Sequence, residues 1–154
     1  MIFDHKVRIF YNAVALVSDP KLKRMLGAYS LNKGGKAPAL VGLERPLEQA
    51  AVLFFFESDC YHCRRELDDV IRNYNEIRAK GYRVISIAAD VDRESYENTS
   101  VAFIWDRADS LCDFKGFDGE NFRNYGVIGT PTIFVVDKDG VIMGRYARVM
   151  EMGI

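Results

Sequence analysis

The chain has few of the features that mark membrane proteins or disulfide-rich secreted domains. Its 154 residues include three cysteines, four prolines and one tryptophan. Three cysteines are too few for a disulfide framework. The longest uninterrupted apolar run, residues 50–56, is seven residues long, whereas a transmembrane helix needs about 20. We therefore predict that no segment of this chain crosses a membrane.

Neither sign of charge dominates the composition. There are 21 Lys and Arg against 22 Asp and Glu, a net charge of −1. This balance predicts no general polyanion-binding surface, so we expect no nucleic-acid partner. Residues 1–36 nevertheless hold seven basic and two acidic side chains, whereas residues 37–154 hold 14 and 20. We interpret the basic segment as a solvated helical face.

The length and the apolar fraction of 49% predict one globular domain with a core. Apolar residues at a spacing of three and four predict a helix over residues 2–17. A second helix is expected to begin at Pro20, with Ser18 and Asp19 at its cap. We therefore divide the chain into an N-terminal helical extension, residues 1–36, and a main domain, residues 37–154.

The main domain has the pattern of an α/β protein with a mixed sheet. The apolar run at 51–56 predicts a strand buried on both faces. A helical stripe follows, with Gly81 as its C-cap, and residues 82–89 predict a second strand parallel to the first. Short helices and loops are expected over 90–126, the last helix covering 120–125. Residues 132–136 and 141–146 predict two antiparallel strands joined by a turn.

Two of the cysteines form a Cys-x-x-Cys pair, Cys60 and Cys63, between the first strand and its helix. At a helix N-terminus the free N–H groups and the helix dipole stabilise a thiolate at Cys60. Cys63 lies one turn further on, where it can attack Cys60 once that sulfur is in a mixed disulfide. His62 adds a possible positive charge, and Glu57 and Asp59 oppose it. The pair therefore predicts thiol–disulfide exchange, with its direction left open.

Two other uses of the cysteines are weighed. Cys60, His62, Cys63 and Cys112 could bind zinc, but the first three point in different directions at the head of one helix, and no second cluster exists. The same thiolates could hold copper(I), as in a metallochaperone. We favour redox use and expect no metal and no cofactor. Cys112, in an acidic setting, is interpreted as structural, with a third redox cysteine as the alternative.

From Pro46 to about Arg145 the chain resembles the thioredoxin-like proteins of the TlpA/ResA type, which are grouped with the AhpC/TSA superfamily. Four segments carry the resemblance: VLFFF at 52–56, CYHCRRE at 60–66, YGVIGTPT at 125–132 and FVVDKDG at 134–140. The resemblance implies a thioredoxin-like sheet flanked by helices. It also implies a thiol-disulfide oxidoreductase that acts on protein substrates.

The resemblance implies roles for individual residues as well. Cys60 and Cys63 would be the redox pair, and Glu66 would accept or supply the Cys63 proton. Pro131 would be a cis proline that presents the Thr130 backbone to an extended substrate. Tyr61 and His62, between the cysteines, would also contact the substrate.

The chain departs from the pattern of this family at three positions near the pair. Asp59 stands where an aromatic residue usually precedes the first cysteine, and Phe56 replaces the usual tryptophan. Phe54 stands where thioredoxins bury an acidic residue. Because Asp59 and Phe56 change the surface around Cys60, the substrate preference of the family does not carry over to this chain.

The leading hypothesis is therefore a protein thiol-disulfide oxidoreductase. By resemblance its compartment is the periplasm or cell envelope, and its redox partner is a membrane thiol reductase of the DsbD/CcdA kind. No signal peptide is visible at the start, which leaves a cytoplasmic protein as the alternative. A thiol peroxidase is a second enzyme hypothesis, although Leu53 and Glu57 stand where peroxiredoxins place their Pro and Thr.

Overall fold

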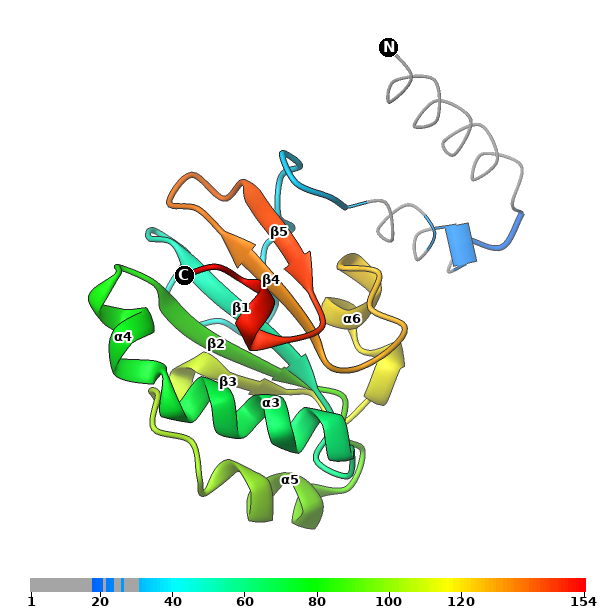
Figure 1. Ribbon diagram of the computed structural model, residues 1–154. Coiled ribbons are helices and arrows are strands. Elements are labelled where there is room, and N and C mark those ends of the chain that lie inside the picture. The colour runs from blue at the N-terminus through cyan, green and yellow to red at the C-terminus, as the bar shows by residue number, and fades with distance from the viewer. Residues whose placement is uncertain (1–17, 21, 24–25, 27–30) are drawn as a thin grey trace.

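The computed structural model describes residues 18–20, 22–23, 26 and 31–154 (Figure 1). The helix expected over 2–17 and most of the second helix lie outside the described residues. The cap of the second helix is within them: the Leu22 N–H donates a 3.3 Å hydrogen bond to the Asp19 carboxylate, as an N-cap requires.

A five-stranded mixed sheet forms the centre of the protein. The strands are β1 (Ala51–Phe56), β2 (Arg83–Ala88), β3 (Ser110–Cys112), β4 (Thr132–Val136) and β5 (Ile142–Tyr146), in the spatial order β3-β2-β1-β4-β5. The pairs β1–β2 and β2–β3 are parallel, and β1–β4 and β4–β5 are antiparallel. The predicted α/β class, the parallel first pair and the antiparallel last pair are confirmed. The short edge strand β3 was not predicted.

Helices flank this sheet. They are α3 (Tyr61–Arg72), α4 (Tyr74–Ala79), α5 (Arg93–Ser100) and α6 (Glu120–Asn124), with 3-10 turns η1 (Arg107–Asp109), η2 (Gly116–Asp118) and η3 (Val149–Glu151). The helical stripe after β1 is divided into α3 and α4 at Asn73. There the Asp69 carbonyl accepts both the Asn73 backbone N–H, at 3.0 Å, and the Asn73 side-chain amide, at 2.8 Å.

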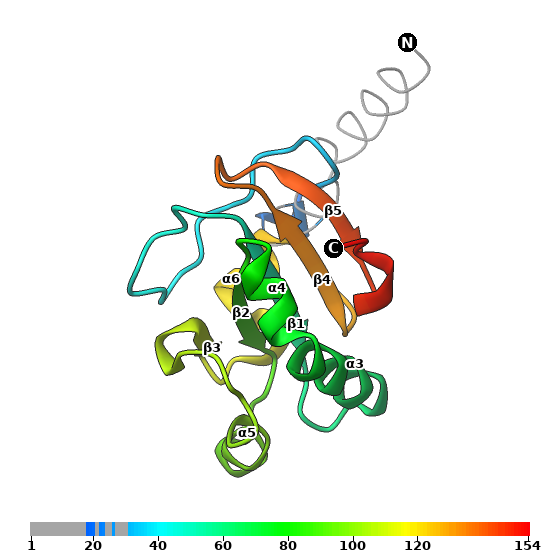
Figure 2. The ribbon, with the colours of Figure 1, turned by 60° about the vertical axis from the view of Figure 1, so that its left-hand side comes forward.

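Alternation along β1 builds a core on each face of the sheet. Val52, Phe54 and Phe56 pack in one cluster with residues of α3 and α4. Leu53 and Phe55 pack in a second cluster with Phe122 of α6 and other residues. Figures 1 and 2 show α3 and α4 over one face and α6 over the opposite face. This two-layer burial explains why every residue of β1 is buried.

The strand directions bring three distant segments to one edge of the sheet. The carboxyl ends of the parallel strands β1 and β2 meet there, because parallel neighbours end on the same side. The beginning of antiparallel β4 lies there too, since Phe55 pairs with Thr132. The loop before α3, the residue Asp90 after β2 and the loop before β4 therefore become neighbours. This edge holds the candidate site.

The opposite margin of the sheet is extended by residues 34–37. The Gly34 N–H donates to the Ile142 carbonyl at 2.7 Å, and the Ile142 N–H donates to the Gly35 carbonyl at 2.8 Å. The Ala37 N–H donates to the Gly140 carbonyl at 2.8 Å. Residues 34–37 are thus hydrogen-bonded to residues 140–142, at the start of β5.

Candidate functional site

Cys60 caps the N-terminus of α3, as its position in the sequence predicts. Its backbone is extended, and its Sγ accepts a 3.2 Å hydrogen bond from the Cys63 N–H. This is the contact that an N-cap side chain makes, with sulfur in place of oxygen. The helix dipole adds positive potential at the same point. The sulfur of Cys60 therefore sits where a helix favours negative charge.

Cys63 lies one turn further along α3, on the side that faces the core. Its side chain is fully buried, together with Glu66, Leu67 and Val70 on the same helical stripe. Burial raises the pKa of the Cys63 thiol to about 12, and the neighbouring Cys60 contributes in the same direction. Cys60 is half-buried, so the two thiols differ in access. The accessible sulfur and the protected sulfur suit an attacking and a resolving role.

The loop before β4 closes over the pair. The Thr130–Pro131 peptide bond is cis. The Cys60 thiol donates to the Thr130 carbonyl at 3.8 Å, across 70 residues of sequence. Thr130 and Pro131 are each half-exposed. The Cys60 sulfur and the backbone of the loop before β4 therefore lie side by side.

Glu57 joins the two loops, a role that the sequence did not predict. The Thr130 hydroxyl donates to its carboxylate at 2.6 Å. The contact links the end of β1 to the loop before β4. The sequence holds no local signal for it, because its partner lies 73 residues away.

Ser58 and Asp90 anchor the loop that carries Cys60. The Ser58 N–H donates to the Asp90 carboxylate at 2.8 Å, and its hydroxyl donates to the other oxygen at 2.5 Å. Both residues are buried. The Arg64 Nε–H donates to the Ser58 carbonyl at 2.9 Å. Sequence analysis missed this anchor, although a carboxylate directly after a parallel strand points to the edge where sites are built.

Glu66 contacts the C-terminal segment. Its carboxylate accepts a 2.7 Å hydrogen bond from the Val149 N–H, and its side chain is buried. The carboxylate thereby satisfies a backbone donor at the start of η3, where the helical turn leaves N–H groups free. Glu66 shares the buried stripe of α3 with Cys63, as its spacing predicts.

The remaining predicted contact residues lie on the surface around the pair. The Tyr61 side chain is 71% exposed, and its ring meets that of His62 edge-on at a centroid distance of 5.6 Å. His62 lines a groove with Thr130 and Pro131. The structure thus brings Cys60, Cys63 and the four expected contact residues to one edge of the molecule.

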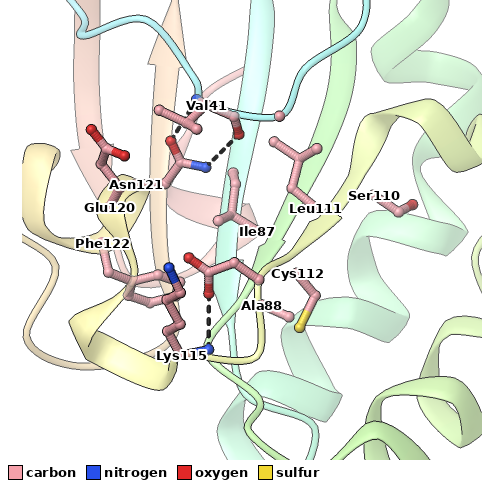
Figure 3. A pocket seen from close by; sticks show the side chains of 12 residues that line it. Val41, Ile87, Ala88, Ser110, Leu111, Cys112, Lys115, Glu120, Asn121 and Phe122 are labelled. Carbon is pink, nitrogen blue, oxygen red and sulfur yellow. Dashed lines mark hydrogen bonds between the residues drawn. The ribbon is translucent and has the colours of Figure 1, made fainter.

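Cys112 belongs to a different environment. It ends β3 and lines a pocket of about 380 Å³ with Ile87, Leu111 and Phe122 among other residues (Figure 3). Its thiol donates to the Asp90 carbonyl at 3.6 Å, and burial raises its pKa to about 11. Within the described ranges, no group of three or more His, Cys, Asp or Glu side chains is placed to hold a metal ion.

Comparison with known proteins identifies relatives of this chain. The model of the AhpC/TSA family matches residues 28–145. The chain is 31% identical, over 91 residues, to the thiol-disulfide oxidoreductase ResA of Bacillus thuringiensis and to that of Bacillus cereus. The match covers 59% of this chain and 50% of each relative. The aligned region thus spans about half the length of the curated relatives.

Solved structures share the fold. The thioredoxin domain of a thiol-disulfide oxidoreductase from Bacteroides vulgatus superposes with a TM-score of 0.68 at 22% identity, covering 80% of this chain and 94% of that one. A thiol:disulfide interchange protein DsbE from Chlorobium tepidum superposes with a TM-score of 0.64 at 26% identity, covering 79% and 91%. The sheet with its flanking helices is therefore a thioredoxin-like fold, as the motifs implied.

Proposed function

The chain belongs to the AhpC/TSA family, and on this premise we propose that Cys60 and Cys63 exchange disulfides with protein substrates. The observation that carries the proposal is the placement of the two sulfurs. Cys60 is accessible at a helix N-terminus and contacts the Thr130 carbonyl, whereas Cys63 is buried one turn behind it. An exposed attacking sulfur beside a protected second sulfur is the arrangement that thiol–disulfide exchange needs.

In the reducing direction the Cys60 thiolate attacks one sulfur of a substrate disulfide. That disulfide breaks, a mixed disulfide forms, and the departing sulfur takes a proton. Cys63 then loses its proton and attacks the Cys60 sulfur. The mixed disulfide breaks, the Cys60–Cys63 disulfide forms, and the substrate leaves with two thiols and two more electrons. The same steps in reverse oxidise a dithiol substrate.

The buried Cys63 thiol needs a base before it can attack, since its pKa is raised to about 12. Glu66 is the carboxylate on the same buried stripe of α3. We assign it the transfer of the Cys63 proton, directly or through one water. Its hydrogen bond from Val149 leaves the other carboxylate oxygen for that role.

We extend the proposal to partners and location. The likeness to ResA and DsbE proteins supports a role in the periplasm or cell envelope, with a membrane thiol reductase of the DsbD/CcdA kind as the redox partner. No helix in the described part of the chain is both long and apolar enough to span a bilayer. Pull-down of the Cys63→Ser variant from envelope extracts, followed by release with a reductant, tests these partners.

The experiment that tests the exchange uses the full chain in single turnover. Reduced protein is mixed with a synthetic peptide disulfide, and after acid quenching the thiols of the peptide are measured separately from those of the protein, because exchange leaves their sum unchanged. We expect Cys60→Ser to abolish the reaction and Cys63→Ser to stop it at a mixed disulfide on Cys60, seen by mass spectrometry. Cys112→Ser is the matched control and should react as the parent does. A Cys60→Ser variant that reacts at the parental rate would overturn the proposal.

A further inference from the structure

A groove runs beside the cysteine pair, between the start of α3 and the segment before η3. It has a volume of about 500 Å³. Its lining includes His62 and Arg65 from α3, Thr130 and Pro131 from the loop before β4, and Arg148. A substrate segment that pairs with the Thr130 edge and joins its sulfur to Cys60 would place its neighbouring side chains in this groove.

The exposed charges of the groove are positive. Arg65 lies on α3 and Arg148 just before η3; both line the groove, and both residues are exposed. Neither has an ion pair with any residue that the structure describes. The imidazole of His62, which also lines the groove, adds an N–H donor.

The acidic groups near this groove are already engaged or lie away from it. Glu66 lines the groove, but it is buried and accepts the Val149 N–H. Glu57 accepts the Thr130 hydroxyl. Asp59 is paired with Arg64 at 3.9 Å. Glu151, on η3, is exposed but is not part of the groove lining.

The positive charge of the groove is opposite in sign to the net charge of the domain. Residues 37–154 carry 14 basic and 20 acidic side chains, so long-range attraction would favour basic substrates. A cationic groove in an acidic domain is therefore a local recognition feature. Guanidinium groups bind carboxylates through paired N–H donors in a fixed plane, which suits Arg65 and Arg148 to acidic side chains.

We propose that this groove selects protein substrates with acidic side chains next to the reactive cysteine. Arg65 and Arg148 bind those carboxylates while Cys60 forms the mixed disulfide. The inference rests on the proposed function and adds the class of substrate to it. Exposed charge pairs are individually weak, so two of them predict a preference of about five- to tenfold in rate.

The test compares three peptide disulfides that differ only in the residues flanking the cysteine: two Glu, two Gln or two Lys. Second-order rate constants are measured with the reduced full chain, at low and at high salt. We expect the Glu peptide to react about five- to tenfold faster than the Gln peptide, and the Lys peptide to react more slowly than both. High salt should reduce the differences, because exposed charge pairs are screened.

Substitution of the two arginines tests whether they cause the preference for the Glu peptide. In Arg65→Gln, Arg148→Gln and the double variant, the ratio of Glu to Gln rates should fall stepwise towards one. Arg78→Gln, an exposed arginine on α4 outside the groove, is the matched control and should keep the parental ratio. Circular dichroism confirms that each variant is folded.

The outcomes separate the two proposals. If all three peptides react at equal rates, the acidic preference is wrong and the exchange activity stands. If no peptide reacts, the proposed function itself fails. Glutathione disulfide, which also carries carboxylates, is run in parallel. A rate far above that of the Glu peptide would overturn the assignment of the groove to protein segments.

Discussion

The contrast between the two thiols is set by a single turn of helix. Cys60, at the cap, is half-buried, and Cys63, three residues later, is fully buried against Phe54, Phe56 and the rest of that core cluster. Burial disfavours the thiolate because a charge loses its hydration in an apolar core. The same local geometry thus gives one sulfur access and gives the other protection.

Alkylation of Cys63 should report this protection. In a Cys60→Ser/Cys112→Ser variant, the iodoacetamide rate should keep rising through pH 10, whereas in denaturant it should level near the ordinary pKa of 9.0. Because the pKa of Cys63 is raised to about 12 in the folded protein, its protonated thiol contributes to the free energy of unfolding, and this contribution is fully present below pH 9. That contribution is lost as the pH rises towards 12. A folded-state rate that levels at pH 9 would contradict the assignment.

Two substitutions separate the roles of Glu66. In Glu66→Gln the amide oxygen can still accept the Val149 N–H, so urea denaturation should give nearly parental stability. The attack of Cys63 on a preformed mixed disulfide should nevertheless slow by on the order of a hundredfold, since a general base is lost. Glu66→Ala should lose both, and be destabilised by about 1–3 kcal/mol through the unpaired N–H. Parental kinetics in Glu66→Gln would reduce Glu66 to a positioning role.

At the level of elements, the sequence predicts best those strands that are continuous apolar runs and are buried on both faces. β1 and β4 were expected over residues 51–56 and 132–136, the observed bounds, because each is apolar and buried on both faces. The three-residue strand β3 was missed, since its side chains are half-buried and show no alternation. The division at Asn73 was also missed, because the apolar stripe runs through it without interruption and the Asn73 N–H keeps its bond to the Asp69 carbonyl.

At the candidate site, the sequence predicts the cysteines and the Thr130–Pro131 loop but not the hydrogen bonds that hold the site together. The cysteine pair and the Thr130–Pro131 loop are visible as motifs, whereas the contacts Glu57–Thr130, Ser58–Asp90 and Glu66–Val149 join residues 73, 32 and 83 positions apart. No local pattern encodes such pairs. They arise from the order and direction of the strands.

The Ser58–Asp90 contact should fix the loop between β1 and α3. Asp90→Ala leaves a buried N–H and hydroxyl without acceptors and should cost about 1–3 kcal/mol of unfolding free energy. In Ser58→Ala/Asp90→Ala the hydroxyl is gone as well, so the double variant should be less destabilised than the sum of the single ones. Urea titration of the four proteins measures the coupling. Strict additivity would mean that the two side chains do not act as a unit.

At the scale of the whole molecule, residues 34–37 form part of the sheet margin next to β5. A chain that begins at residue 31 keeps their hydrogen bonds to residues 140–142, and a chain that begins at residue 38 loses them. We expect the shorter chain to be less stable by about 2 kcal/mol, at about 0.5–1.5 kcal/mol for each bond lost. Fluorescence of Trp105, which is buried, follows the unfolding of both. Equal midpoints in urea would show that this margin contributes nothing.

The separation of the two halves of the site has a consequence for synthesis. Cys60 and the Thr130 carbonyl that it contacts are 70 residues apart in the chain. At about 5–20 residues per second, a ribosome takes roughly 4–14 s to add that stretch. During this interval both sulfurs emerge without β4 or the loop that covers them, exposed to any passing oxidant or thiol. In the folded protein only Cys60 of the pair is accessible, but for these several seconds Cys63 is as accessible to such reagents as Cys60 is.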